Sequence, residues 1–211
     1  MNASWSAPVL RRNGFTLVEL MLSVAIGAAF LTSAITFMLT LGHSMYQIQQ
    51  QLTLESELRL LTQTLTLQLS RAGYVASSHD TSTLVNQLAL NGTLANIHVG
   101  HHPNAPQHSC VLFAYDKNKD GAISLASPSE HFGFRLNNKA LEFRVAGKSC
   151  EASGWHDITD TRKTYVSAFE IKPKQAGQPA WVVTLTLQSA QQAGLTSSRT
   201  FLISATNAHP S

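Results

Sequence analysis

The first long run of apolar residues covers residues 15–41 and contains a single charged side chain, Glu19. A helix rises about 1.5 Å per residue, so this run would be roughly 40 Å long, whereas a bilayer core is about 30 Å thick. Arg11 and Arg12 precede the run, and basic residues mark the flank that stays in the cytoplasm. The pattern therefore predicts a membrane-spanning helix at residues 15–42, with the following domain outside.

Two simpler explanations of the apolar run fit less well. A cleavable secretory signal has a shorter apolar core followed by a small-residue cleavage site. A plain single-pass anchor explains the length but leaves Glu19 unexplained, because a carboxylate inside a membrane segment is costly and usually functional. Glu19 is therefore a candidate functional residue that needs a partner.

After the membrane segment the pattern changes to an apolar stripe with helical spacing, which predicts that the helix continues over residues 43–73. Residues 64–69 also alternate with period two and would suit a strand. The helix is favoured because the wider spacing begins earlier, and because Arg71 and Gly73 are typical of a helix end. The residues of the stripe are Leu54, Leu58, Leu61, Leu65, Leu69 and Ala72.

The remaining residues, 74–211, alternate between short apolar runs and turn residues, which predicts a β-rich head. Asn137, Asn138 and Lys139 predict a hairpin turn between two of these runs. One long helix followed by strands predicts an α+β fold in which the helix packs on an antiparallel sheet. The predicted strands are residues 94–99, 110–115, 132–136, 140–145, 164–172, 180–188 and 199–205.

Charge and composition exclude several classes of function. The net charge is +3, but Arg11 and Arg12 lie in the short leader, and without them 13 basic residues face 12 acidic ones. The basic tract typical of a nucleic-acid-binding domain is missing. The sequence also has no motif for a catalytic nucleophile and no glycine loop for phosphate, so it predicts neither an enzyme nor an organic cofactor.

The strongest local motif outside the helix is D-K-N-K-D-G at residues 116–121. Oxygen ligands at Asp116, Asn118 and Asp120 match the first half of a calcium loop. The twelfth position is Ser127 instead of the usual glutamate, and Asp, Asn and Gly also favour ordinary turns. A weak calcium site and a plain turn both remain open.

The two cysteines, Cys110 and Cys150, lie too far apart for a C-x-x-C metal or redox motif. In an oxidising compartment a single disulfide between them is expected. Two unrelated buried thiols are the alternative.

The stretch Gly14-Phe15-Thr16-Leu17-Val18-Glu19, after a short basic leader, resembles the class III signal of type IV pilins and type II secretion pseudopilins. The resemblance implies that prepilin peptidase cuts after Gly14, removing residues 1–14, and that the new N-terminal amine on Phe15 is methylated. It also implies that Glu19 pairs with the N-terminal amine of a neighbouring subunit during assembly.

Later motifs resemble the PilW-like minor pilins, a group that includes prepilin peptidase-dependent protein B. These motifs are R-A-G-Y at 71–74, E-x-F-G-F-R-L at 130–136 and W-x-x-I-T-D at 155–160. The resemblance implies a pilin-like protein with its head in the periplasm. It would join other minor and major pilins in an inner-membrane complex that primes pilus assembly and ends at the fibre tip. Two alternatives are a J-like pseudopilin of type II secretion and a tip adhesin that binds through residues 75–109.

Overall fold

The computed structural model describes residues 14–76, 96–144, 146–175, 178–207 and 209–210. The chain divides into two compact units, residues 1–48 and 49–211, and each is described by itself. The leader predicted at residues 1–14 lies outside the described residues except for Gly14.

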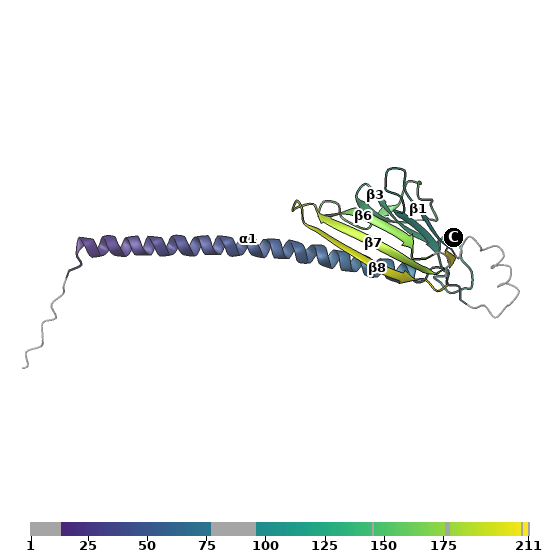
Figure 1. Ribbon diagram of the computed structural model, residues 1–211, viewed down its shortest axis with the longest axis horizontal. Coiled ribbons are helices and arrows are strands. Elements are labelled where there is room, and N and C mark those ends of the chain that lie inside the picture. Colours follow the sequence, from purple (N-terminus) through teal and green to yellow (C-terminus); the bar gives the residue numbers. More distant parts are fainter. Residues whose placement is uncertain (1–13, 77–95, 145, 176–177, 208, 211) are drawn as a thin grey trace, which may run out of the picture. The chain divides into compact units, whose positions relative to one another are not determined.

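One helix and nine strands make up the described secondary structure (Figure 1). The helix, α1, spans Leu17–Leu69 and contributes residues to both units. This confirms the helical interpretation of residues 64–69. The strands are β1 (Asn96–Gly100), β2 (Cys110–Ala114), β3 (His131–Asn137), β4 (Ala140–Phe143), β5 (His156–Asp157), β6 (Thr164–Pro173), β7 (Ala180–Ser189), β8 (Thr196–Ser204) and β9 (His209–Pro210).

The strands form two sheets, whereas the sequence predicted one. A six-stranded sheet has the order β5-β4-β3-β2-β1-β9, and a three-stranded sheet has the order β6-β7-β8. All neighbouring strands are antiparallel except β1 and β9, which are parallel. The α+β class is confirmed, and the head divides its strands between two sheets that share one core.

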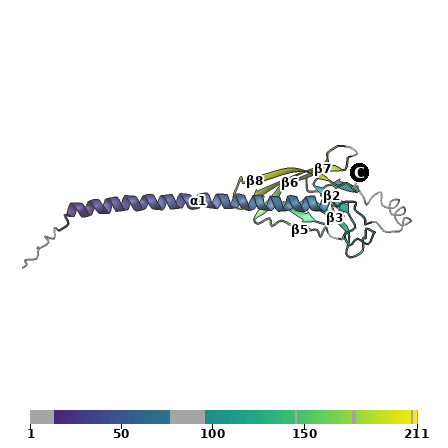
Figure 2. The ribbon, with the colours of Figure 1, turned by 90° about the horizontal axis from the view of Figure 1, so that it is seen from below.

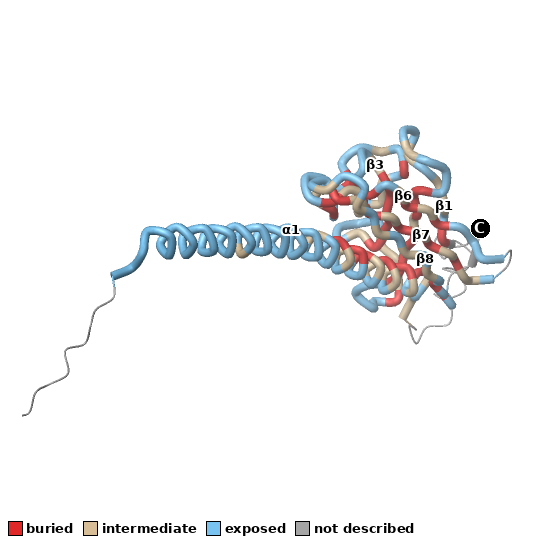
Figure 3. The backbone as a smooth tube through the Cα atoms, turned by 60° about the vertical axis from the view of Figure 1, so that its left-hand side comes forward, coloured by how far each residue is buried: buried red, intermediate tan, exposed pale blue. Residues whose placement is uncertain are grey.

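That core is built around the helical stripe predicted from the sequence. Within residues 49–211, α1 lies along strands of both sheets (Figure 2), and the buried residues of that unit gather where these elements meet (Figure 3). Strand β7 presents alternate residues to the same core. Burying such side chains stabilises the fold by about 1.5–3 kcal/mol for each large aliphatic residue. The helix contributes Leu54, Leu58, Leu61, Leu65 and Leu69, the turn after it contributes Ala72, and β7 contributes Trp181, Val183, Leu185 and Leu187.

The hairpin between β3 and β4 has a two-residue turn. Asn138 and Lys139 have φ angles of 47° and 66°, and Asn137 pairs with Ala140. Positive φ at both central residues is typical of a type I′ turn, whose twist matches that of the flanking strands. The three-residue turn suggested by the sequence is therefore one residue too long. The observed register places Arg135 opposite Glu142.

Strand β4 is shorter than the predicted strand at 140–145 because Arg144 turns back onto its own loop. The guanidinium group donates hydrogen bonds to the carbonyl oxygens of Lys148, Gly147 and Phe132. Burial lowers the pKa of Arg144 to about 10.

Candidate functional site

The processing and assembly chemistry expected at the helix start rests on residues that the structure describes, which are Gly14, Phe15, Thr16 and Glu19. Helix α1 begins at Leu17, directly after Thr16. The Phe15 side chain is 87% exposed. No atom lies within 4 Å of the position that a Cβ on Gly14 would occupy. The end of the chain that processing would create is therefore not covered by other described residues.

Thr16 and Glu19 form a capping box, which was not predicted from the sequence. The backbone N–H of Thr16 and its hydroxyl both donate to Oε2 of Glu19, at 3.0 and 2.9 Å. The backbone N–H of Glu19 donates back to the Thr16 hydroxyl at 3.3 Å. The pattern T-x-x-E at a helix start was the available signal. Glu19 thus has a partner within its own chain as well as the predicted one on a neighbour.

The helix is long and apolar enough, by length and composition, to cross a membrane. Its most apolar 18-residue window has a mean hydropathy of 2.0, and none of that window is buried. Hydroxyl side chains in this part, including Thr32 and Thr36, donate to backbone carbonyls three or four residues earlier. Such bonds satisfy polar groups inside an apolar segment.

Cys110 and Cys150 form a disulfide, as predicted, with their Cα atoms 6.1 Å apart and a sequence separation of 40. The bond joins β2 to the loop after β4. Trp155 packs on the disulfide in a small cluster separate from the main core. The bridge therefore fastens a loop over the outer face of the six-stranded sheet.

Arg135 ties the same loop to the sheet, a role that the sequence did not reveal. Its guanidinium donates to the carbonyl oxygens of Cys150 and Ala152, at 2.6 and 2.8 Å. It forms an ion pair with Glu142 and lies over the Trp155 ring, 4.5 Å from the centroid. The side chains of Arg135 and Glu142 are only 3% and 9% exposed. Each charge therefore offsets the free-energy cost of burying the other.

The D-K-N-K-D-G loop is organised by its own backbone amides. Oδ1 of Asp116 accepts from the N–H of Lys119, and Oδ2 accepts from the N–H groups of Gly121 and Ala76. Asp116 is 2% exposed. Its carboxylate is therefore turned into the loop and satisfied there.

Glu130 supplies a second clamp on the backbone of this loop. One of its oxygens accepts from the N–H groups of Lys117 and Asn118, at 2.7 and 3.1 Å. The other accepts from the N–H of Ser124 at 2.9 Å. In the described part of the chain, no group of three or more His, Cys, Asp or Glu side chains is arranged to hold a metal ion.

Calcium binding by Asp116, Asn118 and Asp120 remains a prediction. Asp120 is exposed and is the carboxylate most available to an ion. At calcium concentrations tenfold above the Kd, binding would stabilise the protein by about 1.4 kcal/mol, or roughly 3–6 °C in Tm. We expect this rise in thermal melts of the purified protein in calcium against EDTA, and expect Asp120→Asn to remove it. The exposed Asp157 provides the control variant Asp157→Asn, and equal Tm values in both buffers would leave the loop as a backbone clamp alone.

The binding face considered at residues 75–109 falls largely outside the described residues, because 77–95 are not among them. The flanking residues that are described belong to the helix end, to β1 and to the turn before β2. The structure therefore supplies no geometry for an adhesive loop.

These features define a class of protein. Residues 10–35 match the prokaryotic N-terminal methylation motif. The match covers the capping box and the beginning of the apolar helix, and an α+β head follows. The chain is a pilin-like protein anchored through its N-terminal helix and dependent on prepilin peptidase for processing; pilin-like families are structural rather than enzymatic.

The head identifies the family within that class. Residues 47–205 match the family described as prepilin peptidase-dependent protein B, and the chain belongs to this family. The resemblance found in the sequence is confirmed.

Two relatives illustrate the match. The prepilin peptidase-dependent protein B of Escherichia coli (strain K12) is 27% identical over 185 residues, covering 87% of this chain and 89% of the relative. An uncharacterized protein of Haemophilus influenzae (strain ATCC 51907 / DSM 11121 / KW20 / Rd) is 26% identical over 155 residues, covering 56% of this chain and 65% of the relative. No solved structure matches the chain.

Proposed function

We propose that this protein is a minor pilin that helps to prime type IV pilus assembly in the inner membrane and then occupies the fibre tip. The observation that carries the proposal is the helix start, where Gly14, Phe15 and Glu19 precede or begin an apolar helix within a matched methylation motif. Its partners are other minor and major pilins, and we assign it no catalytic step.

The topology follows from charge and redox chemistry. Arg11 and Arg12 hold the leader in the cytoplasm, and the apolar part of α1 crosses the inner membrane. The head then lies in the periplasm, where a disulfide such as Cys110–Cys150 forms and persists. Prepilin peptidase cuts after Gly14, and the new N-terminus at Phe15 is methylated.

The capping box explains how Glu19 can serve two partners. Only Oε2 accepts the bonds from Thr16, and among the described residues no hydrogen bond reaches Oε1. An ammonium group from a neighbouring subunit can therefore approach Oε1 while the helix start stays capped. In a membrane the pairing of these opposite charges offsets the cost of burying each one alone.

Two substitutions separate the charge of Glu19 from its capping role. Glutamine also serves at this position of a capping box, so Glu19→Gln removes the charge and keeps the box. Thr16→Val removes the two hydrogen bonds of the hydroxyl, which opens the box, and keeps the charge. We expect Glu19→Gln to be cleaved normally. The amount of other pilins that co-purifies with it should fall at least about tenfold, since one charged hydrogen bond is worth about 1.5–3 kcal/mol.

We expect Thr16→Val to assemble, with a smaller loss. Cleavage is read by immunoblot, and assembly by crosslinking and co-purification of membrane complexes together with counts of surface pili. Normal assembly of Glu19→Gln would show that the charge is not the assembly contact. Failure of Thr16→Val alone would assign the role of Glu19 to capping.

A further inference from the structure

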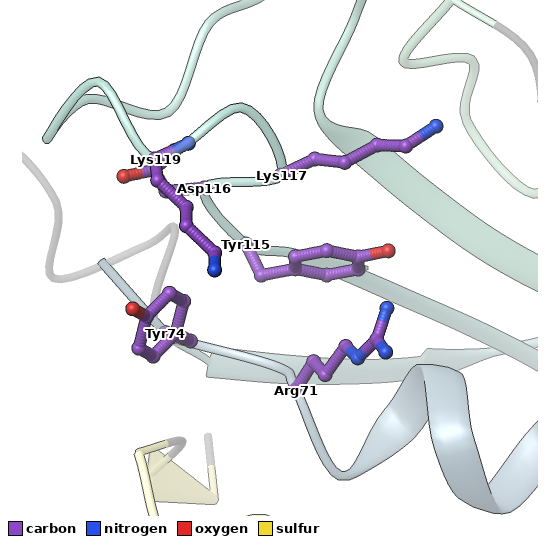
Figure 4. Close-up of a pocket in the computed structure, with 6 residues that line it drawn as sticks. All are labelled: Arg71, Tyr74, Tyr115, Asp116, Lys117 and Lys119. Carbon is purple, nitrogen blue, oxygen red and sulfur yellow. The ribbon is translucent and has the colours of Figure 1, made fainter. Parts of the chain in front are cut away.

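A cavity of about 370 Å³ lies where the end of α1 meets the loop after β2, within the 49–211 unit. Figure 4 shows its wall of aromatic rings and long cationic side chains. Nothing in the processing or assembly of the N-terminal segment uses this cavity. Its lining residues are Arg71, Tyr74, Tyr115, Asp116, Lys117 and Lys119.

This cavity, the Arg71 pocket, has a rigid floor. Tyr115 is 3% exposed, and its hydroxyl donates to the side chain of Gln68 at 2.9 Å. The guanidinium carbon of Arg71 lies 6.0 Å from the centre of the Tyr115 ring. A ring face attracts a cation at this distance, so the Arg71 head is positioned before any ligand arrives.

The loop that forms the opposite wall is equally fixed. The backbone N–H of Lys117 is bound by Glu130, and that of Lys119 by Asp116. Lys119 has a φ angle of 65°, a left-handed conformation that these two carboxylates help to hold. Its side chain runs toward Tyr74 in Figure 4. The loop thus turns the Asp116 carboxylate inward, whereas Lys117 and Lys119 line the pocket.

The charge of the pocket is unbalanced. Of the six lining residues three are cations and one is an acid, which gives a net charge of 3 − 1 = +2. Both oxygens of the acid, Asp116, already accept backbone N–H groups. Within the described ranges neither Arg71 nor Lys117 nor Lys119 belongs to an ion pair. These cations are available to an external anion.

We propose that the Arg71 pocket binds a carboxylate side chain on an acidic segment of a partner protein. The arginine fork matches the geometry of a carboxylate, and Lys119 adds a second charge. Tyr74, which is partly exposed, offers ring surface of the kind that anchors protein interfaces. Together these groups fit a peptide side chain and its neighbours better than a free ion.

The position of the pocket favours a protein over a lipid headgroup. Residues 49–69 of α1 span about 30 Å within the head at 1.5 Å per residue. The Arg71 pocket therefore lies at the end of the head remote from where the chain enters it. Attraction to anionic lipid falls off within about a Debye length, close to 8 Å at physiological salt.

Peptide binding by the full-length protein in a non-ionic detergent tests the proposal. The probe is a fluorescein-labelled hexaglutamate peptide, followed by fluorescence anisotropy, with labelled hexalysine as the opposite-charge control. We expect saturable hexaglutamate binding that weakens about tenfold in Arg71→Gln and in Lys119→Gln. The exposed Lys174 lies outside the pocket, so Lys174→Gln should bind as the wild type does.

Three outcomes would overturn the proposal. They are no saturable binding to the wild type, equal binding by the wild type and the Arg71→Gln/Lys119→Gln double variant, and displacement of the peptide by inorganic phosphate more readily than by free glutamate. The last would make the site a phosphate site. Because processing and pilus assembly are not read in this assay, its result is independent of the proposed pilin function.

Discussion

Replacing Gly14 with leucine is expected to leave essentially all of the protein uncleaved in the inner membrane, retaining the leader at residues 1–14. The protein belongs to a prepilin peptidase-dependent family and carries the methylation motif across this position. A branched side chain at Gly14 would obstruct the close approach of the peptidase to the backbone before the cut. Immunoblots for size and mass spectrometry for a methylated Phe15 measure the outcome.

Folding does not account for this expected loss. A Cβ at Gly14 meets no atom within 4 Å, so the described part of the chain accommodates the substitution. Gly42 is equally uncrowded and lies in the same helix, which makes Gly42→Leu the matched control, expected to be cleaved normally. Cleavage of Gly14→Leu at the wild-type level would refute the assignment of the processing site.

Replacing Arg135 with leucine is expected to destabilise the head by about 3–5 kcal/mol, because it leaves the Glu142 carboxylate buried without its partner. For a chain of this size the loss corresponds to roughly 6–20 °C in Tm. The substitution also removes the bonds that hold the carbonyl oxygens of Cys150 and Ala152. Thermal unfolding of the purified protein in detergent measures the change.

Two further variants distinguish loss of the pair from loss of packing. The double variant Arg135→Leu/Glu142→Leu should recover part of the stability, since an apolar pair leaves no uncompensated charge. Arg162 pairs with Asp160 at the surface, where its side chain is 89% exposed, so Arg162→Leu should leave Tm nearly unchanged. A wild-type Tm for Arg135→Leu would contradict the structural role of the buried pair.

Turn geometry shows where reasoning from the sequence stopped short. The three turn residues Asn137, Asn138 and Lys139 predicted the hairpin, but a turn one residue shorter changes which side chains face each other across the strands. A shift of one residue moves every side chain to the other face. The observed pairing of Arg135 with Glu142 depends on that register. The positive φ angles at Asn138 and Lys139 form the two-residue turn that sets this register.

The D-K-N-K-D-G loop shows a different limit. The sequence identified its oxygen-bearing side chains, yet their directions depend on backbone amides brought together by folding. Asp116 binds the N–H of Ala76, 40 residues away in sequence, and Glu130 reaches back to Lys117. The same folding brings Arg71 beside Tyr115 and creates a cationic pocket. Local sequence does not record such distant contacts.

The sequence by itself determined the features that depend on local order along the chain. These are the apolar helix, the processing motif with Glu19, the leucine stripe and the alternation of β7, because helical and strand periodicities are properties of neighbouring residues. Thr16 belongs with them, since its capping box is also local. The tertiary structure alone decided the division into two sheets, the burial of the Arg135–Glu142 pair and the Arg71 pocket. The sheets and the pocket join residues far apart in sequence. The Arg135–Glu142 pair forms within one hairpin, but Cys150, Ala152 and Trp155, which contact Arg135, come from a later loop that only folding brings there.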